Sequence, residues 1–323
     1  MALQSGAAGA LPAGVWSPLP SRSQRPADQT VSMPVSRPVG IRSGLLDTAS
    51  MKPARWSEPE LKLFPHQVGF TAPPMDFDAA PTDFLRIAPE TVGAHGRLLH
   101  LPGYAHELTQ RADNLHLLEE VAECMSNSGA DAVGQVGTNW VHAGGTDAGA
   151  IRDFCAEMTE RYETPFHMAG LCLVEACEAL EVTRVALNSV YYWPDWRDGL
   201  VRFLRSADLD VVWAGNFVDQ GFFASQEEVN ARSWIFPGDL ASRSMCRVAE
   251  AAPEAEVILV NGMPNWRGDD GLPRRTVTLA ARLEEEVDRP VIASDLALYW
   301  AIFRSLGVAP LGDQGHLLGS LQV

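Results

Sequence analysis

The sequence predicts an α/β fold in which parallel sheets are covered by helices on both faces. From about Gln67 onward, short apolar runs alternate with amphipathic helical stretches, which is typical of such three-layer folds. The runs at 132–137 and 257–261 each end abruptly at Gly, Asn or Thr, as buried parallel strands do. Open α/β sheets bind ligands at the carboxyl ends of their strands. Two such ends in two halves therefore predict one site shared across a cleft.

The strands and helices are predicted from the hydrophobic periodicity of the chain. Apolar positions at Leu115, Leu118, Val121 and Met125 form one stripe of a helix. Strands are expected at 67–72, 97–102, 132–137, 165–169, 184–190, 209–216, 257–261 and 291–294. Helices are expected at Leu108–Asn127, Asp147–Tyr162, Leu171–Leu180 and Pro273–Val287. The long aromatic loop 215–238 is more typical of a lid or insertion than of a plain connection.

The composition predicts a soluble globular protein with room for two domains. The chain has 323 residues, of which 46% are apolar, without an unbroken apolar stretch near the roughly 18 residues that cross a bilayer. The net charge of −16 argues against nucleic acid and against an anionic membrane as partner. A small anionic substrate remains compatible, because a site responds to its local donors.

The five cysteines predict free thiols in a reducing, cytoplasmic compartment. They are odd in number and scattered, and no CxxC pair occurs among them. We therefore expect neither a disulfide framework nor a zinc site. Residues 1–62 are rich in Pro, Ser, Gly and Ala and lack a sustained period, which predicts a disordered tail.

Several segments together resemble the aspartate/glutamate racemase superfamily, most closely its arylmalonate decarboxylase and maleate isomerase branch. The segments occur in the order and spacing of that family, and each is short. They are Val68-Gly69-Phe70-Thr71-Ala72-Pro73-Pro74, Gly137-Thr138-Asn139, His167-Met168-Ala169-Gly170, Arg184-Val185-Ala186-Leu187 with Tyr191, Ile258-Leu259-Val260-Asn261-Gly262, and Pro290-Val291-Ile292-Ala293-Ser294 with Tyr299-Trp300. The resemblance extends over about 67–310, most of the folded part.

The resemblance implies two flavodoxin-like, three-layer α/β/α halves related by pseudo-twofold symmetry. The first domain is then 63–176 plus 291–323, and the second is 177–290. It also implies an active site between the halves and a reaction that needs no metal or organic cofactor. We expect a monomer or a homodimer acting on a small-molecule carboxylate.

The chain departs from this family at the two catalytic thiols. Relatives carry a cysteine at one or both of the twin strand ends, where a thiolate moves a proton at the α-carbon. The matching positions here are Gly137 and Asn261, and no cysteine lies within ten residues of either. Racemisation by two thiols is therefore excluded, and so is a decarboxylation that is protonated by a thiol.

The remaining family positions predict a cradle of neutral donors for a carboxylate. The resemblance assigns this role to Gly137, Thr138, Asn139, Tyr191, Asn261 and Gly262. Oriented amides and hydroxyls stabilise negative charge as it forms in an enolate-like transition state. Strand termination and turn capping are the alternative role of Thr138 and Asn139.

The proton must then come from another group, and two candidates are placed best. Asp76 follows the Pro73-Pro74 turn at the mouth of the cleft, as does Asp78, and His142 lies three residues beyond Asn139. Asp295 follows the last predicted strand, where capping of the next helix is its alternative role. Asn261 is expected to contribute to catalysis by hydrogen bonding, because an amide supplies no proton at neutral pH.

The sequence favours a cofactor-independent decarboxylase or isomerase that works without a thiol. Aromatic residues follow several predicted strands, so the expected substrate is a hydrophobic or aryl carboxylic acid. They are Trp140, Tyr191, Tyr192, Trp193, Phe217 and Trp266. Two alternatives stay open: a non-catalytic carboxylate sensor or complex partner that keeps the cradle, and a hydrolase or addition enzyme acting on a heterocycle.

Overall fold

The structure is a computed structural model, and it describes residues 61–74, 78–232, 235–261 and 265–321. All but the last two residues of the predicted tail lie outside these ranges, so its predicted disorder stays a prediction. The described residues belong to one compact unit. None of the helices in the described ranges is long and apolar enough to cross a membrane.

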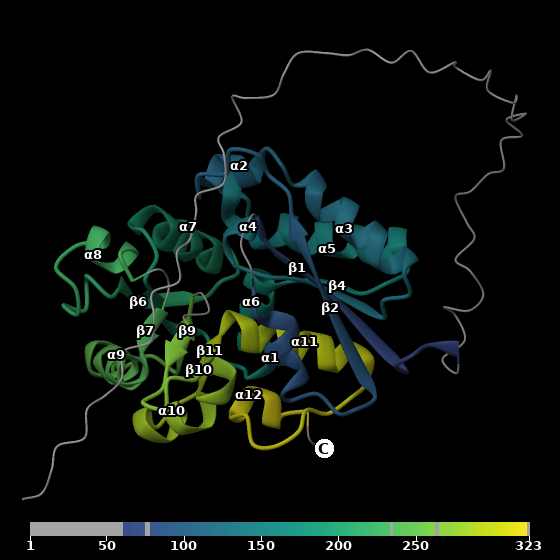
Figure 1. Ribbon diagram of the computed structural model, residues 1–323. Helices are drawn as coiled ribbons and strands as arrows, with labels where there is room; N and C mark the ends of the chain where they lie inside the picture. The colour runs from purple at the N-terminus through teal and green to yellow at the C-terminus, as the bar shows by residue number, and fades with distance from the viewer. Residues whose placement is uncertain (1–60, 75–77, 233–234, 262–264, 322–323) are drawn as a thin grey trace, which may run out of the picture. The chain divides into compact units, whose positions relative to one another are not determined.

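The first sheet is four-stranded and parallel, with the strand order β2-β1-β3-β4. Helices α3 and α5 pack against one face, and α1, α6 and α11 lie on the other (Figure 1). The strands are β1 (His66–Pro74), β2 (Val92–Leu99), β3 (Ala132–Gln135) and β4 (Phe166–Met168). The helices are α1 (Ala80–Leu85), α3 (His116–Asn127), α5 (Ala148–Tyr162), α6 (Ala169–Ala179) and α11 (Ser294–Leu306).

The second sheet repeats this arrangement, with the order β11-β8-β5-β6. Within each half the strands can be numbered by their order in the chain. Read from β2 in the first sheet and from β6 in the second, both sheets then have the order second, first, third, fourth, which is the flavodoxin-like order. The strands are β5 (Arg184–Val190), β6 (Asp210–Asn216), β8 (Val257–Val260) and β11 (Val291–Ala293), and the helices are α7 (Pro194–Arg205), α9 (Gly238–Ala251) and α10 (Ala280–Val287). The predicted α/β fold with two parallel-sheet halves is confirmed.

A third, small sheet was not predicted from the sequence. It has the order β10-β9-β7, with β7 parallel and β10 antiparallel to β9, and it can be followed beside β6 and β11 in Figure 1. The strands are β7 (Ile235–Pro237), β9 (Asn265–Arg267) and β10 (Pro273–Arg274). Its last strand and the 3-10 turn η5 (Thr276–Thr278) replace the start of the helix predicted at 273–287. The long aromatic loop also contains α8 (Gln226–Asn230) and β7.

Two further boundaries differ from the prediction because tertiary pairing sets them. β2 begins at Val92, not at 97, because residues 92–96 pair with β1 from the register His66↔Val92 onward. The helix predicted at 108–127 is two helices, α2 (Leu108–Ala112) and α3. Short elements complete the fold: α4 (Asn139–His142), η4 (Ala143–Gly145) and α12 (His316–Gly319).

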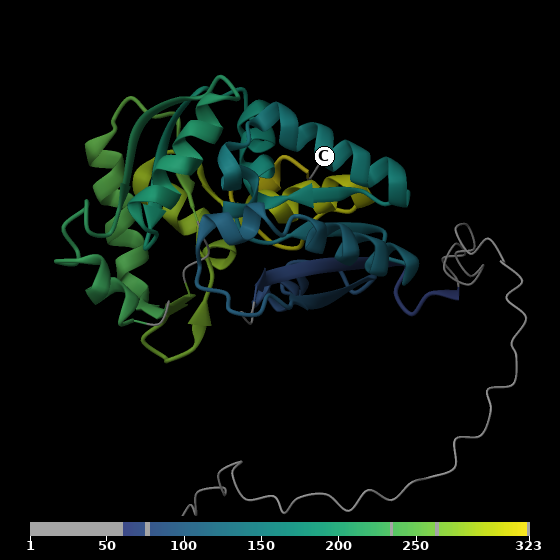
Figure 2. The same ribbon diagram turned by 90° about the horizontal axis from the view of Figure 1, so that it is seen from above.

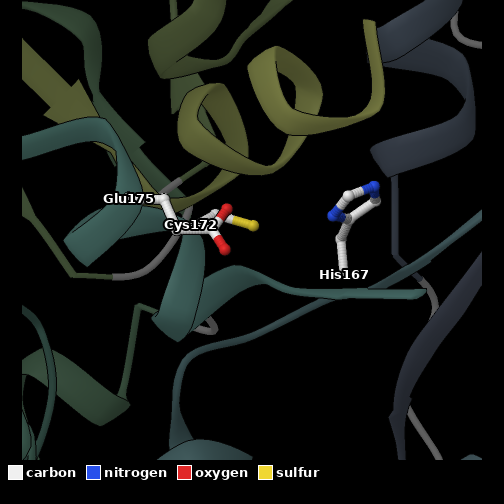
Figure 3. Close-up of side chains that lie close together, drawn as sticks. All are labelled: His167, Cys172 and Glu175. Carbon is white, nitrogen blue, oxygen red and sulfur yellow. The ribbon is translucent and has the colours of Figure 1, made fainter. Parts of the chain in front are cut away.

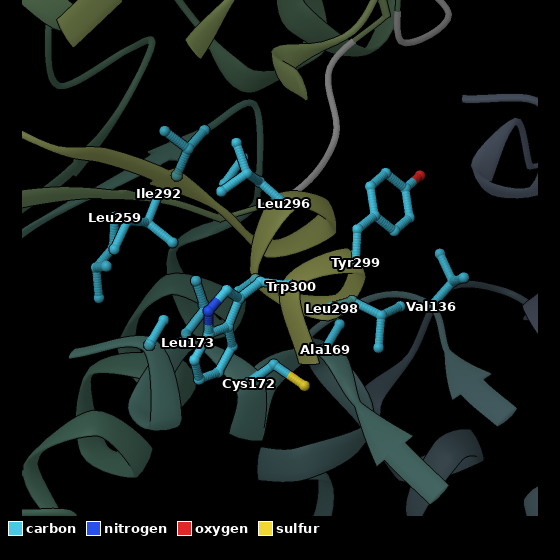
Figure 4. Packing of buried hydrophobic residues seen from close by; sticks show 14 of the residues in the cluster. Val136, Ala169, Cys172, Leu173, Leu259, Ile292, Leu296, Leu298, Tyr299 and Trp300 are labelled. Atoms are coloured by element: carbon cyan, nitrogen blue, oxygen red, sulfur yellow. The ribbon is translucent and has the colours of Figure 1, made fainter. Parts of the chain in front are cut away.

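Helix α11 is the central element of the core. Its residues from Ser294 to Phe303 are all buried, as expected for a helix that is apolar on every side. It packs against β3, β4 and α6 of the first half and against β11 of the second (Figure 4). β11 belongs to the second sheet although the predicted first domain resumes at 291, so the chain changes halves between β11 and α11. The division into domains remains a prediction.

Close packing of α11 on β3 leads to a test of stability. A Cβ at Gly134 would lie 2.9 Å from Ile302 Cδ1 and 3.3 Å from Leu298 Cδ1. We expect Gly134→Val to lower the free energy of unfolding by about 1–3 kcal/mol, because overpacking forces neighbouring side chains to shift. Gly319→Val is the control, since nothing lies within 4 Å of its Cβ position. Urea unfolding measures both, and equal losses would contradict this packing.

Candidate active site

The carboxyl end of β3 opens into a turn that only glycine accommodates easily. Gly137 has φ +91°, and no atom of the described residues lies within 4 Å of the position that a Cβ would take. The side chain of Gln135 holds this turn by donating from Nε2 to the carbonyl of Gly137, at 2.9 Å. The Val136 amide donates to Thr71 Oγ1 at 3.4 Å, which ties the end of β3 to that of β1. A ligand group can therefore approach the backbone at Gly137.

The carboxyl ends of the third strands of the two sheets meet through a direct side-chain contact. The Thr138 hydroxyl donates to Oδ1 of Asn261, and both residues are fully buried. The amide of Asn261 donates to Ser189 Oγ at 3.2 Å, and its backbone N–H donates to the Asn188 carbonyl at 2.8 Å. The structure thus brings together Thr138 and Asn261, which are 123 positions apart in the sequence. Gly262, predicted beside them, lies outside the described residues.

Asn139 and His142 lie on α4, which follows this turn. Both are buried, and Nε2 of His142 lies 3.3 Å from Oδ1 of Asn139. The other nitrogen, Nδ1, faces α7, where a Cβ on Gly199 would lie 2.5 Å from it. Burial, with Arg111 and Arg202 nearby, lowers the pKa of His142 to about 3. The ring is uncharged at neutral pH, so it suits orientation of Asn139 better than proton donation.

Tyr191 follows the end of β5 through a strained residue. Val190 has φ +42°, a conformation that β-branched residues rarely adopt. The Tyr191 ring stacks on Phe236 with centroids 5.6 Å apart, and its hydroxyl donates to that of Tyr192 at 3.5 Å. Burial raises the pKa of Tyr191 well above its usual value, so it remains a protonated donor.

Charged side chains from both halves form a buried cluster that sequence reasoning largely missed. Arg275, which follows β10, lies with Nε 2.8 Å from Asp83 on α1 and 4.0 Å from Asp295 on α11. Its Nη2 lies 3.9 Å from Asp78. Asp78 and Asp295 were among the candidates predicted from the sequence. Arg275 and Asp83 were not, because Arg275 lies within a predicted helix and Asp83 does not follow a predicted strand. Asp76 lies outside the described residues.

A cavity of about 240 Å³ lies beside α1 and the ends of β1 and β3, and Asp78 is the one member of the cluster that lines it. Asp78 lines it together with Thr71 and Val136, the residue before Gly137. The rest of its wall is mainly apolar and comes from Phe70, Ala80, Pro81, Thr82, Gly96 and Leu98. By contrast, the aromatic residues Trp140, Phe217 and Trp266 are fully buried in the core. The cavity therefore combines an apolar wall with a carboxyl group and a hydroxyl group.

The thiols lie on helices, and none of them lies at the carboxyl end of β3 or β8. Three are buried, Cys155 on α5 and both Cys172 and Cys177 on α6, whereas Cys124 is exposed and Cys246 is half-buried. Cys172 lies near His167 and Glu175, with ligand atoms within 4.8 Å of one another (Figure 3). His167 Nε2 is 2.6 Å from Ser305 Oγ, and Glu175 pairs with Arg304 at 3.4 Å. Because protein groups already engage two of these three side chains, we assign no metal to them.

Comparisons of the sequence and of the fold with known proteins identify a family and several similar structures. A sequence model of the arylmalonate decarboxylase family matches residues 102–318. A crystal structure of arylmalonate decarboxylase is similar, with 21% identity and a TM-score of 0.59, covering 78% of this chain and 99% of that one. Maleate isomerase from Pseudomonas putida S16 has 18% identity and a TM-score of 0.59, with 79% and 99% covered. Maleate cis-trans isomerase from Nocardia farcinica has 17% identity and a TM-score of 0.58, with 80% and 100% covered. No match was found among curated proteins.

The lowered pKa of His142 predicts a pH dependence of stability. Its ordinary pKa is 6.5 and its folded pKa is about 3, so the unfolded state binds the proton first as the pH falls. Stability is then complete above pH 6.5 and is lost progressively toward pH 3. Between pH 7 and pH 4.5, we expect the free energy of unfolding of His142→Gln to fall by about 2 kcal/mol less than that of the wild type. Urea unfolding at both pH values measures this, with exposed His116→Gln as control. Parallel losses in all three proteins would contradict the burial of a neutral His142.

Proposed function

Because the chain belongs to the arylmalonate decarboxylase family, we propose that it is a decarboxylase or isomerase that uses an enolate-like intermediate and no catalytic thiol. The observation that carries the proposal is the contact of Thr138 with Asn261 beside the open space at Gly137. It places neutral donors from both halves at the carboxyl ends of equivalent strands. That is where α/β folds of this order bind their ligands.

The donors suit a carboxylate and the charge that develops next to it. Asn139 keeps its amide N–H groups as donors when His142 donates to its Oδ1. Asn261 uses one amide hydrogen on Ser189 and has a second, and the Thr138 hydroxyl rotates to serve a ligand in place of Asn261 Oδ1. Preorganised donors in a buried site stabilise an enediolate far better than water does.

Decarboxylation of a malonate follows from this arrangement. The bond between the α-carbon and one carboxylate breaks, carbon dioxide leaves, and the electron pair passes into an enediolate held by the donors. The α-carbon then takes a proton, so each turnover consumes one. In an isomerase, a nucleophile such as water would add to one carbon of the enedioate double bond, and the electron pair would pass into an enolate that the same donors stabilise. Rotation about the resulting single bond and loss of the nucleophile would then give the trans isomer.

The apolar wall of the cavity supports an aryl or otherwise hydrophobic substituent on the substrate. Phe70, Leu98 and Val136 contribute to this wall next to the β3 strand end. A cavity of about 240 Å³ holds a substituent, with the carboxylate bound at the donors. The substrate class we propose is therefore a small carboxylic acid with a hydrophobic group on its α-carbon.

Incubation with a panel of acids in deuterium oxide tests the proposed function. The panel contains aryl-malonates, cis-enedioates and α-substituted monoacids, and NMR follows loss of carbon dioxide, isomerisation and incorporation of deuterium. We expect label at the α-carbon of the product. Alkylation of the accessible thiols with iodoacetamide should leave the rate nearly unchanged. Binding without any exchange would favour a carboxylate sensor, and loss of turnover prevented by substrate would show that a thiol takes part.

Asn261 gives the sharpest mutational prediction. Asn261→Ala removes the partner of Thr138 and Ser189, and we expect turnover to fall on the order of 10²-fold, as for the loss of one oxyanion donor. Asn261→Cys places a thiol where relatives are expected to carry one, and should decarboxylate a bound aryl-malonate faster than the wild type. Asn127→Ala, at an exposed position of α3, is the control for Asn261→Ala. Circular dichroism checks folding, and an unchanged rate in Asn261→Ala would remove Asn261 from the site.

A further inference from the structure

A row of three polar side chains crosses the carboxyl edge of the second sheet, with Asn261 as its middle member. Val260 is the last residue of β8, and it pairs with β5 on one side and with β11 on the other. Continuing both registers by one residue places Ser189 and Ser294 on either side of Asn261. Neighbouring strands lie about 4.8 Å apart, so side chains at one register position are neighbours. All three residues of the row are fully buried.

The side chain of Ser189 belongs to the contact between the two halves. The residue before it, Asn188, points to α9, where it donates to Ser244 Oγ at 2.7 Å. Successive side chains of a strand point to opposite faces, so Ser189 faces away from α9. Its Oγ accepts the amide of Asn261 at 3.2 Å, and Asn261 in turn accepts the hydroxyl of Thr138 from the first half. Ser189 is therefore one hydrogen bond removed from the donor that the first half supplies.

The hydroxyl groups of Ser189 and Ser294 have hydrogen-bonding capacity that the protein does not use. A serine hydroxyl donates one hydrogen bond and accepts two. Ser189 Oγ accepts from Asn261, and the described part of the chain offers no acceptor for its own O–H. Ser294 Oγ is buried and has no hydrogen-bond partner among the described residues. Because an unpaired buried donor is costly, a ligand that accepts from both hydroxyl groups gains affinity from them.

Location distinguishes these two serines from another buried serine. Ser126 Oγ on α3 also lacks a partner within the described ranges. However, α3 leads into the amino end of β3, which is the opposite edge of the first sheet. Ser189 and Ser294 lie at a carboxyl edge, where open α/β sheets bind their ligands. Ser126 therefore provides a matched control for both.

We propose that Ser189 and Ser294 bind the substrate carboxylate on either side of Asn261, and that their hydroxyl groups donate to the negative charge of the enediolate. This inference rests on the proposed function and adds two catalytic residues to it. Both O–H bonds stay intact, so each serine acts through a hydrogen bond alone. Donors of this kind stabilise an anion more than a neutral group of the same shape.

Ser189→Ala and Ser294→Ala test the two donors by kinetics. With the acid of the panel that turns over, we expect kcat/KM to fall on the order of 10²-fold in each variant, as for the loss of one oxyanion donor. Ser126→Ala removes an equally buried hydroxyl and should leave kcat/KM unchanged. An unchanged kcat/KM in Ser189→Ala or in Ser294→Ala would overturn the proposal while leaving the decarboxylase or isomerase assignment intact.

Ligand binding separates a donor from a residue that only packs. Calorimetry compares phenylmalonate with its neutral diamide in the wild type and in the two variants. We expect each variant to bind phenylmalonate about tenfold more weakly and to lose less affinity for the diamide, because hydrogen bonds to charged groups are the stronger ones. Equal losses for the two ligands would indicate a general loss of packing and would overturn the proposal.

A third measurement uses the wild-type protein and needs no turnover. Carbon-13 NMR of protein labelled at serine Cβ follows Ser189, Ser294 and Ser126 as phenylmalonate, maleate or phenylacetate is added, and each signal is assigned from the variant that lacks it. We expect the signals of Ser189 and Ser294 to shift and that of Ser126 to stay in place. Such shifts without turnover would support the carboxylate site although the proposed catalysis fails. An acid that binds by calorimetry and moves neither signal would overturn the site, and the absence of binding by any acid would overturn both.

Discussion

The complete burial of helix α11 is the constraint on which the rest of the molecule depends. Ten consecutive residues, from Ser294 to Phe303, are closed off from solvent, so the helix needs apolar neighbours on every side. The first sheet supplies them through β3, β4 and α6, and the second supplies them through β11. Because one helix is shared in this way, the carboxyl ends of the two sheets are held close enough for Thr138 to contact Asn261.

The same helix sets the electrostatics of the site. Its first turn carries Asp295 into the interior, where Arg275 and Asp83 are its charged neighbours. A carboxyl group at that depth is held near its titration point by two opposing effects, since burial favours the neutral acid and the guanidinium favours the anion.

Polar groups around the strand ends are positioned by neighbours that do no chemistry. Gln135 holds the turn at Gly137, Ser189 holds Asn261, and neutral His142 contacts Asn139. Strain is also concentrated here, because Val190 takes a left-handed conformation directly before Tyr191. Such a conformation persists only where the surroundings enforce it, and it is more frequent at functional sites than elsewhere.

The sequence by itself determined the α/β class, the location of most strands and the two strand ends that meet, because apolar periodicity and abrupt polar termini are local signals. It also showed that Gly137 and Asn261 stand at these two strand ends. Only the tertiary structure showed that His142 is buried and uncharged. The sequence places this ring just after a strand end, where it is expected to be accessible, but α7 covers it. Likewise, only the fold brought Arg275 to Asp83 and Asp295. Arg275 follows a strand of the small sheet and Asp295 lies on the shared helix, whereas Asp83 is 192 positions before Arg275, and no local pattern records a pairing over that distance.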